Sequence, residues 1–156
     1  MTSMIQPTNI QLNSTASSQA GVFQAIADLA IENGLATSAD EVVKGLQTRE
    51  AQSTTGFQDG FAIPHTQSEA VVKPGIIIVR TETGIEWGSF DDQPAFFFLA
   101  LLIPKSEAGT THLQALSALS RVLMDDKDRQ ALLNANTNED LAQLVEKAIT
   151  TTQEEN

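Results

Sequence analysis

The chain has 156 residues, 41% of them apolar, and nine basic against twenty acidic side chains give it a formal charge of −11. This length suits one modest domain with its own core, and the charge repels nucleic acid and anionic lipid over a Debye length of roughly 8 Å. The lack of cysteine excludes disulfides and thiolate metal sites, and no window approaches the roughly 18 apolar residues of a membrane span, so we expect a soluble, cytoplasmic protein.

The N-terminal part of the chain predicts a strand and then a helix. Residues 1–7 look like a loose start, and residues 9–13 alternate apolar and polar side chains as a strand does. A helix is expected to begin at Ser17 or Ser18, because serine is a favoured N-cap, and to stop at Gly34, because glycine readily adopts the left-handed conformation that ends helices.

The next segment predicts a second helix and a short strand. Ser38 and Glu41 have the spacing of a capping-box pair that opens a helix. That helix is expected to end near residues 49–51. Residues 61–63 then read as a short apolar strand that leads to a proline.

Two strands are expected to be buried on both faces. Residues 75–80 form a β-branched run with three consecutive isoleucines, and residues 95–103 form a longer apolar run that ends at Pro104. Residues 86–93 are rich in turn formers and connect them, and residues 105–110 form a polar loop. Buried central strands of this kind need helices on both sides of the sheet.

The C-terminal part of the chain predicts helices. Thr111 and Gln114 form another capping-box pair, which predicts that a helix begins there. Further helices are expected over about 128–134 and 138–149, followed by a polar tail. We therefore predict an α/β fold for residues 1–156: one domain with a core of about residues 8–150, whose mixed sheet has about four to five strands and is flanked by helices on both faces.

The most informative motif surrounds one of the two histidines of the chain. Pro64 fixes its own φ near −65° and holds Ile63 in an extended conformation, so the direction in which His65 leaves the short strand is constrained. A neutral imidazole at a strand edge is a nucleophile at physiological pH and needs no helper base.

These residues belong to a longer pattern that resembles a known family. The pattern looks like the fructose/mannitol-type IIA domain (EIIA, type 2) of the bacterial phosphoenolpyruvate-dependent sugar phosphotransferase system (PTS), and the resemblance spans about residues 8–150. It is carried by Thr48-Arg49-Glu50, Ser53-Thr54-Thr55-Gly56-Phe57-Gln58-Asp59-Gly60-Phe61-Ala62-Ile63-Pro64-His65, Val72-Lys73-Pro74-Gly75-Ile76, Ile85-Glu86-Trp87 and Thr111-His112-Leu113-Gln114-Ala115-Leu116.

The resemblance implies a phosphotransferase that works as a protein phosphohistidine relay. His65 would accept a phosphoryl group from the histidine carrier protein HPr and pass it to an EIIB domain or protein, which serves sugar uptake. The membrane component EIIC would be only an indirect partner. No cofactor or metal is implied, and the sequence leaves open the sugar, the ring nitrogen that carries the phosphate and the oligomeric state.

The second histidine gains meaning from the expected helix start. If Thr111 is the N-cap, His112 occupies the first helical position, where free backbone N–H groups and the helix dipole favour an anion over an imidazolium. The resemblance implies that His112 lies beside His65 and supports it, without being the phosphoryl carrier.

Three more residues complete the expected site. Arg49 is the most plausible cationic contact for phosphoryl oxygens, because its planar guanidinium matches them and stays charged. The resemblance implies that Asp59 orients an imidazole or anchors Arg49, and Thr66 is expected to help to hold phosphate through its hydroxyl.

Other functional classes stay open at this point. A metal-dependent hydrolase would use His65 and His112 with Asp59, Asp91 or Asp92, although no H-E-x-x-H spacing supports it. A serine hydrolase lacks the G-x-S-x-G motif. A regulatory, nitrogen-type EIIA that signals by its phosphorylation state is a closer alternative, and a non-catalytic binding module is a further one.

Overall fold

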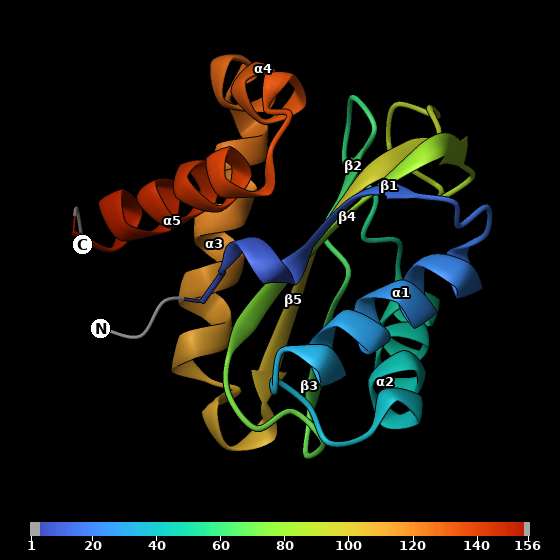
Figure 1. The fold of residues 1–156 in the computed structure, drawn as a ribbon, viewed down its shortest axis with the longest axis vertical. Helices are drawn as coiled ribbons and strands as arrows, with labels where there is room; N and C mark the ends of the chain where they lie inside the picture. Colours follow the sequence, from blue (N-terminus) through green and yellow to red (C-terminus); the bar gives the residue numbers. More distant parts are fainter. Residues whose placement is uncertain (1–3, 155–156) are drawn as a thin grey trace.

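A computed structural model describes residues 4–154 of the chain, and within them a five-stranded mixed sheet carries helices on both faces (Figure 1). The predicted α/β class is confirmed. The strands are β1 (Ile10–Ser14), β2 (Phe61–Ala62), β3 (His65–Ser68), β4 (Gly75–Ile85) and β5 (Ala95–Pro104). The helices are α1 (Gln19–Glu32), α2 (Ala39–Gln52), α3 (Thr110–Met124), α4 (Asp126–Asn134) and α5 (Asn138–Glu154), with 3₁₀ turns η1 (Pro7–Asn9) and η2 (Lys105–Glu107).

The sheet is built around an antiparallel pair, β4 and β5. Strand β1 lies parallel to the outer side of β4, and β2 and β3 both lie parallel to the outer side of β5. The edge of the sheet beside β5 is therefore made of two short strands in line. This edge is where the predicted nucleophile lies.

Strands β2 and β3 are two pieces of one interrupted edge strand. Phe61 pairs with Phe97 and His65 pairs with Leu101, so the register along β5 is the same in both pieces. Proline has no N–H for the ladder, and Pro64 accordingly interrupts the edge strand, although its carbonyl still accepts from the Leu101 N–H at 2.9 Å. The sequence suggests that His65 follows the end of a short strand; in the structure it is instead the first residue of β3.

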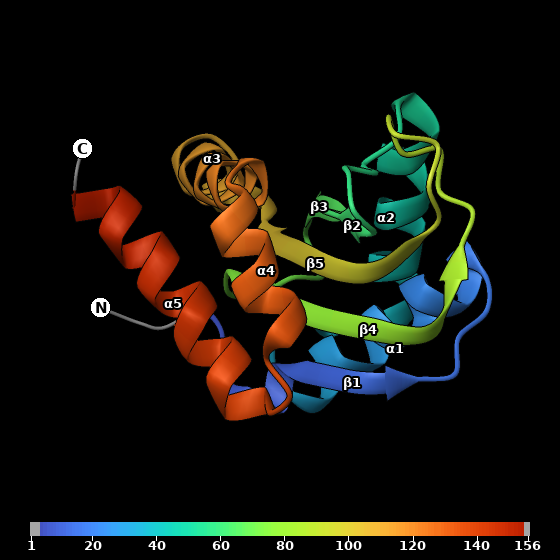
Figure 2. The same cartoon turned by 90° about the horizontal axis from the view of Figure 1, so that it is seen from above.

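The core is divided by the sheet into two layers. Helices α1 and α2 cover one face, and α3, α4 and α5 cover the other (Figure 2). Successive side chains of β5 alternate between the layers, so that Phe97 packs with the second group of helices and Phe98 with the first. Both central strands are buried on two faces, as their continuous apolar sequence predicted.

Two of the predicted helix starts are confirmed and one is wrong. Ser18 caps α1 by accepting from the Gly21 N–H at 3.0 Å, and Ser38 caps α2 by accepting from the Glu41 N–H at 3.3 Å. Helix α3 begins one residue before the predicted N-cap, at Thr110 after Gly109. His112 is therefore the third helical residue, still within the first turn.

Both ends of the described chain are more ordered than the sequence suggested. The segment expected to be a loose start contains Ile5, which is 3% exposed in the core, and the Met4 carbonyl accepts from the Ile76 N–H at 2.8 Å. At the other end α5 continues to Glu154, beyond the predicted end of the helix near residue 149. None of the helices within residues 4–154 has the length and apolarity that a membrane crossing requires.

Candidate active site

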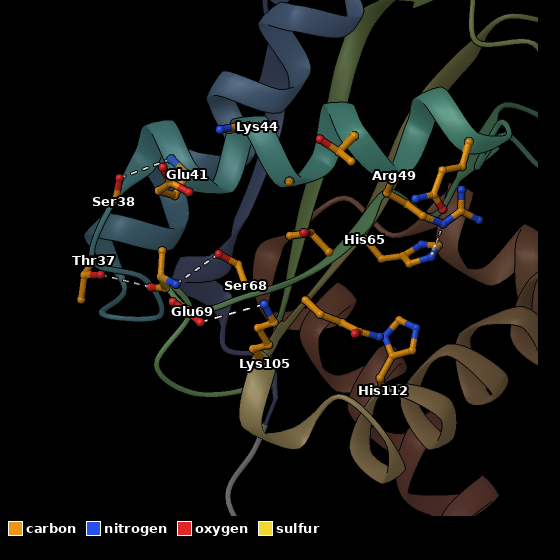
Figure 3. A pocket seen from close by; sticks show the side chains of 16 residues that line it. Thr37, Ser38, Glu41, Lys44, Arg49, His65, Ser68, Glu69, Lys105 and His112 are labelled. Atoms are coloured by element: carbon orange, nitrogen blue, oxygen red, sulfur yellow. Dashed lines mark hydrogen bonds and ion pairs between the residues drawn. The ribbon is translucent and has the colours of Figure 1, made fainter.

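A cleft of about 880 Å³ opens at the β3 edge of the sheet, between α2 and the start of α3. Figure 3 shows Arg49, His65 and His112 gathered at one end of it, whereas Thr37, Ser38 and Glu69 lie at the other. The two histidines and the arginine come from three different elements. The fold thus brings together three of the side chains that the sequence singled out.

The His65 ring is held through both nitrogens. Its Nδ1 lies 2.8 Å from the Ile63 carbonyl oxygen, which accepts only, so Nδ1 must carry the hydrogen. The Nε2 atom then has a free lone pair, and it accepts from Arg49 Nε–H at 3.0 Å. The carbonyl and the ring belong to residues two apart in the chain, on either side of Pro64. The residue is 8% exposed, and its ring lines the cleft.

Arg49 reaches the imidazole from the last turn of α2. Its Nη1 donates to the Ser53 carbonyl at 2.9 Å, just beyond the end of the helix, while its Nε donates to the ring. The guanidinium is partly buried and keeps its charge at every physiological pH. It therefore places a permanent cation beside Nε2 of His65.

His112 faces His65 across the cleft. The ring centroids are 5.4 Å apart, and the two planes are inclined by 44°. Its Nδ1 is buried and finds no hydrogen-bond partner in the described part of the chain. A proton on Nδ1 would be left unpaired, so the neutral ring is expected to carry its hydrogen on Nε2.

Both imidazoles are kept neutral. Burial lowers the pKa of His65 from its ordinary value, the bond to the Ile63 carbonyl opposes this, and the charges of Arg49 and His112 lower the pKa further. Burial also lowers the pKa of His112, and Arg49 adds to the effect. At pH 7 the site consequently holds one fixed cation and two neutral rings.

Asp59 does not occupy the position that the resemblance implied. Its carboxylate pairs with Arg129 of α4, at 2.9 Å between Oδ2 and Nε, and its N–H donates to Asp91. Asp59 also has a φ of 56° in the tight turn before β2, which directs its side chain towards α4. Arg49, which Asp59 was expected to anchor, is held instead by the Ser53 carbonyl.

Thr66 is buried against α2 beneath Gly45. A Cβ at Gly45 would lie 3.2 Å from the Thr66 Cβ and closer still to its Oγ1, so the hydroxyl points towards the helix backbone. The absence of a side chain at Gly45 is what lets α2 approach β3. The geometry indicates a packing role for Thr66, but the residue also lines the cleft, so the contact of its hydroxyl with phosphate stays a prediction.

The arrangement that the metal-hydrolase alternative requires does not form. The Asp59 N–H donates to the Asp91 carboxylate and the Asp59 carboxylate pairs with Arg129 of α4, whereas the two histidines lie in the cleft. Within the residues that the structure describes, no three His, Asp or Glu side chains gather as a metal site would need.

Sequence reasoning did not identify the groups that hold the side chains of Arg49 and His65 in place. The carbonyl of Ser53 and that of Ile63 are backbone groups, which no side-chain motif reveals. Glu50 accepts from the N–H and the hydroxyl of Thr55, both at 2.6 Å. The available signal was the run Ser53-Thr54-Thr55-Gly56, whose hydroxyl-bearing residues favour such local side-chain bonds.

Comparisons with known proteins match nearly the whole length of the chain. Residues 3–148 match the family described as phosphoenolpyruvate-dependent sugar phosphotransferase system, EIIA 2. A "PTS system fructose-specific EIIA component" of Haloferax volcanii is 34% identical over 140 residues, which cover 90% of each chain. A fructose-specific EIIABC component of Bacillus subtilis is 31% identical over 146 residues, 93% of this chain but only 23% of that protein.

Solved structures show the same fold. The nitrogen regulatory protein IIA-Ntr from Neisseria meningitidis superimposes with a TM-score of 0.83 and 25% identity, over 91% of this chain and 96% of that one. A complex of enzyme IIA-mannitol with phosphorylated enzyme IIB-mannitol from Escherichia coli gives a TM-score of 0.73 at 19% identity, over 90% and 96%.

Proposed function

Because this chain belongs to the EIIA 2 family of the phosphoenolpyruvate-dependent sugar phosphotransferase system, we propose that His65 is its phosphoryl carrier, loaded by HPr and unloaded onto an EIIB component during sugar uptake. The observation that carries the proposal is the held ring of His65. Its Nδ1 is tied to the Ile63 carbonyl, so the lone pair of Nε2 is directed towards Arg49. Because HPr and the EIIB component would meet the chain in the cytoplasm, we propose that it acts in that compartment.

The proposed chemistry is an in-line displacement at phosphorus. The Nε2 lone pair of His65 attacks the phosphoryl group of phospho-HPr, a new N–P bond forms, and the bond to the donor nitrogen breaks with its electron pair returning to the donor. The hydrogen stays on Nδ1 throughout and remains hydrogen-bonded to the Ile63 carbonyl oxygen. Because the ring is already neutral, no general base is needed.

Arg49 and His112 are proposed to stabilise the charge on the transferred group. In the resting site the Arg49 Nε–H occupies the lone pair of Nε2, so it must leave that nitrogen when phosphorus approaches and then donate to a phosphoryl oxygen. His112, 5.4 Å away between ring centroids, is proposed to donate from Nε2–H to a second oxygen. No cofactor is required for these steps.

The fructose-type assignment is supported by the Haloferax volcanii relative, a fructose-specific EIIA component that matches along 90% of this chain. The partnership with EIIB is supported by the mannitol IIA–IIB complex, whose IIA chain has the same fold. The proposed substrate is thus a protein phosphohistidine, with fructose or a related sugar as the final acceptor elsewhere in the system.

The test is reconstitution with the upstream enzyme, HPr and phosphoenolpyruvate, followed by mapping of the phosphate. We expect one acid-labile phosphate on His65, lost in His65→Ala and still formed, more slowly, in His112→Ala. Labelling that persisted in His65→Ala would show that another residue is the carrier. Attachment to Nδ1 instead of Nε2 in the ³¹P spectrum would contradict the proposed geometry.

A second candidate function is favoured by the likeness to the nitrogen regulatory protein from Neisseria, which has the highest TM-score among the structures described above. A regulatory EIIA would use the same histidine and signal through its phosphorylation state. The two functions differ after loading. Transfer of labelled phosphate from His65 to a fructose-type EIIB, with a rate comparable to loading, supports the transport role, and stable retention of the label supports the regulatory one.

A further inference from the structure

We propose that Glu50 is a positioning residue, whose carboxylate sets the geometry of the reacting imidazole. It acts through residues 53–55, the short segment that follows α2, which we call the 53–55 turn. This inference rests on the proposed function of His65. Glu50 follows Arg49 in α2, so the two side chains leave the helix in directions about 100° apart. Arg49 reaches the cleft directly, whereas Glu50 acts through the turn behind it.

The first connection runs through Thr55 to Nδ1 of the ring. Glu50 Oε2 accepts from the Thr55 N–H and Oε1 accepts from the Thr55 hydroxyl, both at 2.6 Å. The Thr55 carbonyl in turn accepts from the Ile63 N–H at 3.0 Å, and the Ile63 carbonyl holds His65 Nδ1 at 2.8 Å. The position of the carbonyl that fixes the tautomer thus depends on where the carboxylate places Thr55.

The second connection runs through Ser53 to Nε2 of the ring. The Ser53 carbonyl accepts from Arg49 Nη1 at 2.9 Å, and Arg49 Nε donates to His65 Nε2 at 3.0 Å. Ser53 and Thr55 are the two ends of one three-residue turn. Both nitrogens of the imidazole are therefore held by groups whose positions the Glu50 carboxylate influences.

The turn has a further anchor at Trp87, just beyond the end of β4, which makes the role of Glu50 separable from gross folding. The Thr54 hydroxyl donates to the Trp87 carbonyl at 2.7 Å, and the Trp87 indole N–H donates to the Thr55 hydroxyl at 3.2 Å. Trp87 itself is 4% exposed in the core. Without the carboxylate the turn stays attached to Trp87, but the Thr55 N–H loses its acceptor.

Loss of the Glu50 carboxylate is expected to affect the rate of phosphoryl transfer more than the affinity for HPr. A displacement of about 1 Å at a reacting group can cost about 10²-fold in rate, so we expect Glu50→Ala to reduce the single-turnover rate of transfer from phospho-HPr by about 10- to 100-fold. The KM for HPr is expected to stay near the wild-type value, because Glu50 does not line the cleft. Glu50→Gln keeps one acceptor oxygen and is expected to recover part of the rate.

The decisive experiment combines that rate with the tautomer of His65, read from ¹⁵N chemical shifts at pH 8 in the unphosphorylated protein. In the wild type we expect the hydrogen on Nδ1, and in Glu50→Ala a mixture of the two tautomers. Glu32→Ala serves as the matched control, because it removes a carboxylate from an exposed helix end in α1. It is expected to leave both readouts unchanged.

The outcomes separate this inference from the proposed function. A wild-type protein that takes no phosphate on His65 refutes the proposed function. If the wild type is labelled but Glu50→Ala and Glu50→Gln keep both the wild-type rate and the wild-type tautomer, the positioning role is refuted. Circular dichroism and a thermal melt establish that each variant is folded; if Glu50→Ala is not, Glu50→Gln alone decides between a reduced and an unchanged rate.

Discussion

Replacement of Arg49 by alanine is expected to have two opposed effects on the proposed phosphoryl transfer, and their typical magnitudes indicate which one dominates. The variant loses the donor at 3.0 Å from His65 Nε2, so the lone pair no longer has to be freed before attack. A hydrogen bond of this kind contributes about 1 kcal/mol net. Removing a preorganised donor that stabilises charge in the transition state costs about 2.7–4 kcal/mol. The loss is the larger quantity by about 1.7–3 kcal/mol, so we expect transfer from phospho-HPr to slow by about 20- to 150-fold.

The same variant tests the electrostatics of the site in the absence of any partner. The positive charge of Arg49 contributes to the low pKa of both His65 and His112. Its removal should raise the pKa of both imidazoles in an NMR titration, even though burial continues to lower them. Arg121→Ala is a suitable control, because it removes an equal charge from an exposed position late in α3.

Either readout can refute the reasoning. An Arg49→Ala protein that is phosphorylated at the wild-type rate would mean that the guanidinium does not stabilise the transferred group. A pKa of His65 that stays constant or falls would mean that the arginine does not act on the ring as the 3.0 Å contact implies. A parallel change in Arg121→Ala would show that the effect is one of net charge alone.

Two further predictions concern stability. The folded protein lowers the pKa of His65 and His112, so the unfolded chain binds protons more readily between the folded pKa values and about 6.5. The contribution of these rings to the free energy of unfolding is therefore complete above that pH and falls on acidification, by at most about 1.4 kcal/mol per pH unit for each ring. Urea denaturation at pH 7.5 and 5.5 checks this, and His65→Gln should flatten the dependence. Gly60→Ala should lower the free energy of unfolding by at least about 1–2 kcal/mol. Gly60 has a φ of +88°, and an added Cβ would also meet the Phe96 ring. An unchanged denaturation midpoint would show that the turn relaxes freely.

Much of the fold and part of the site follow from local patterns in the chain. Ser18 and Ser38 cap their helices as the spacing predicted, because a cap is a bond across only three residues. The apolar runs around residues 75–80 and 95–103 had to be strands with both faces covered. The constraint that Pro64 places on His65 is equally local, and the structure uses it to fold the ring onto the Ile63 carbonyl.

The contacts that define the site required the tertiary structure. Arg49 and His65 are 16 residues apart and belong to different elements, so their 3.0 Å contact depends on how closely α2 packs on β3. The resemblance suggested Arg49 as a partner of Asp59, whereas the observed partner is Arg129, 70 residues away, because of where α4 is placed. Helix caps and strand periodicity depend on residues that are close in the sequence. The partner of a charged side chain depends instead on how elements that are distant in the sequence pack together.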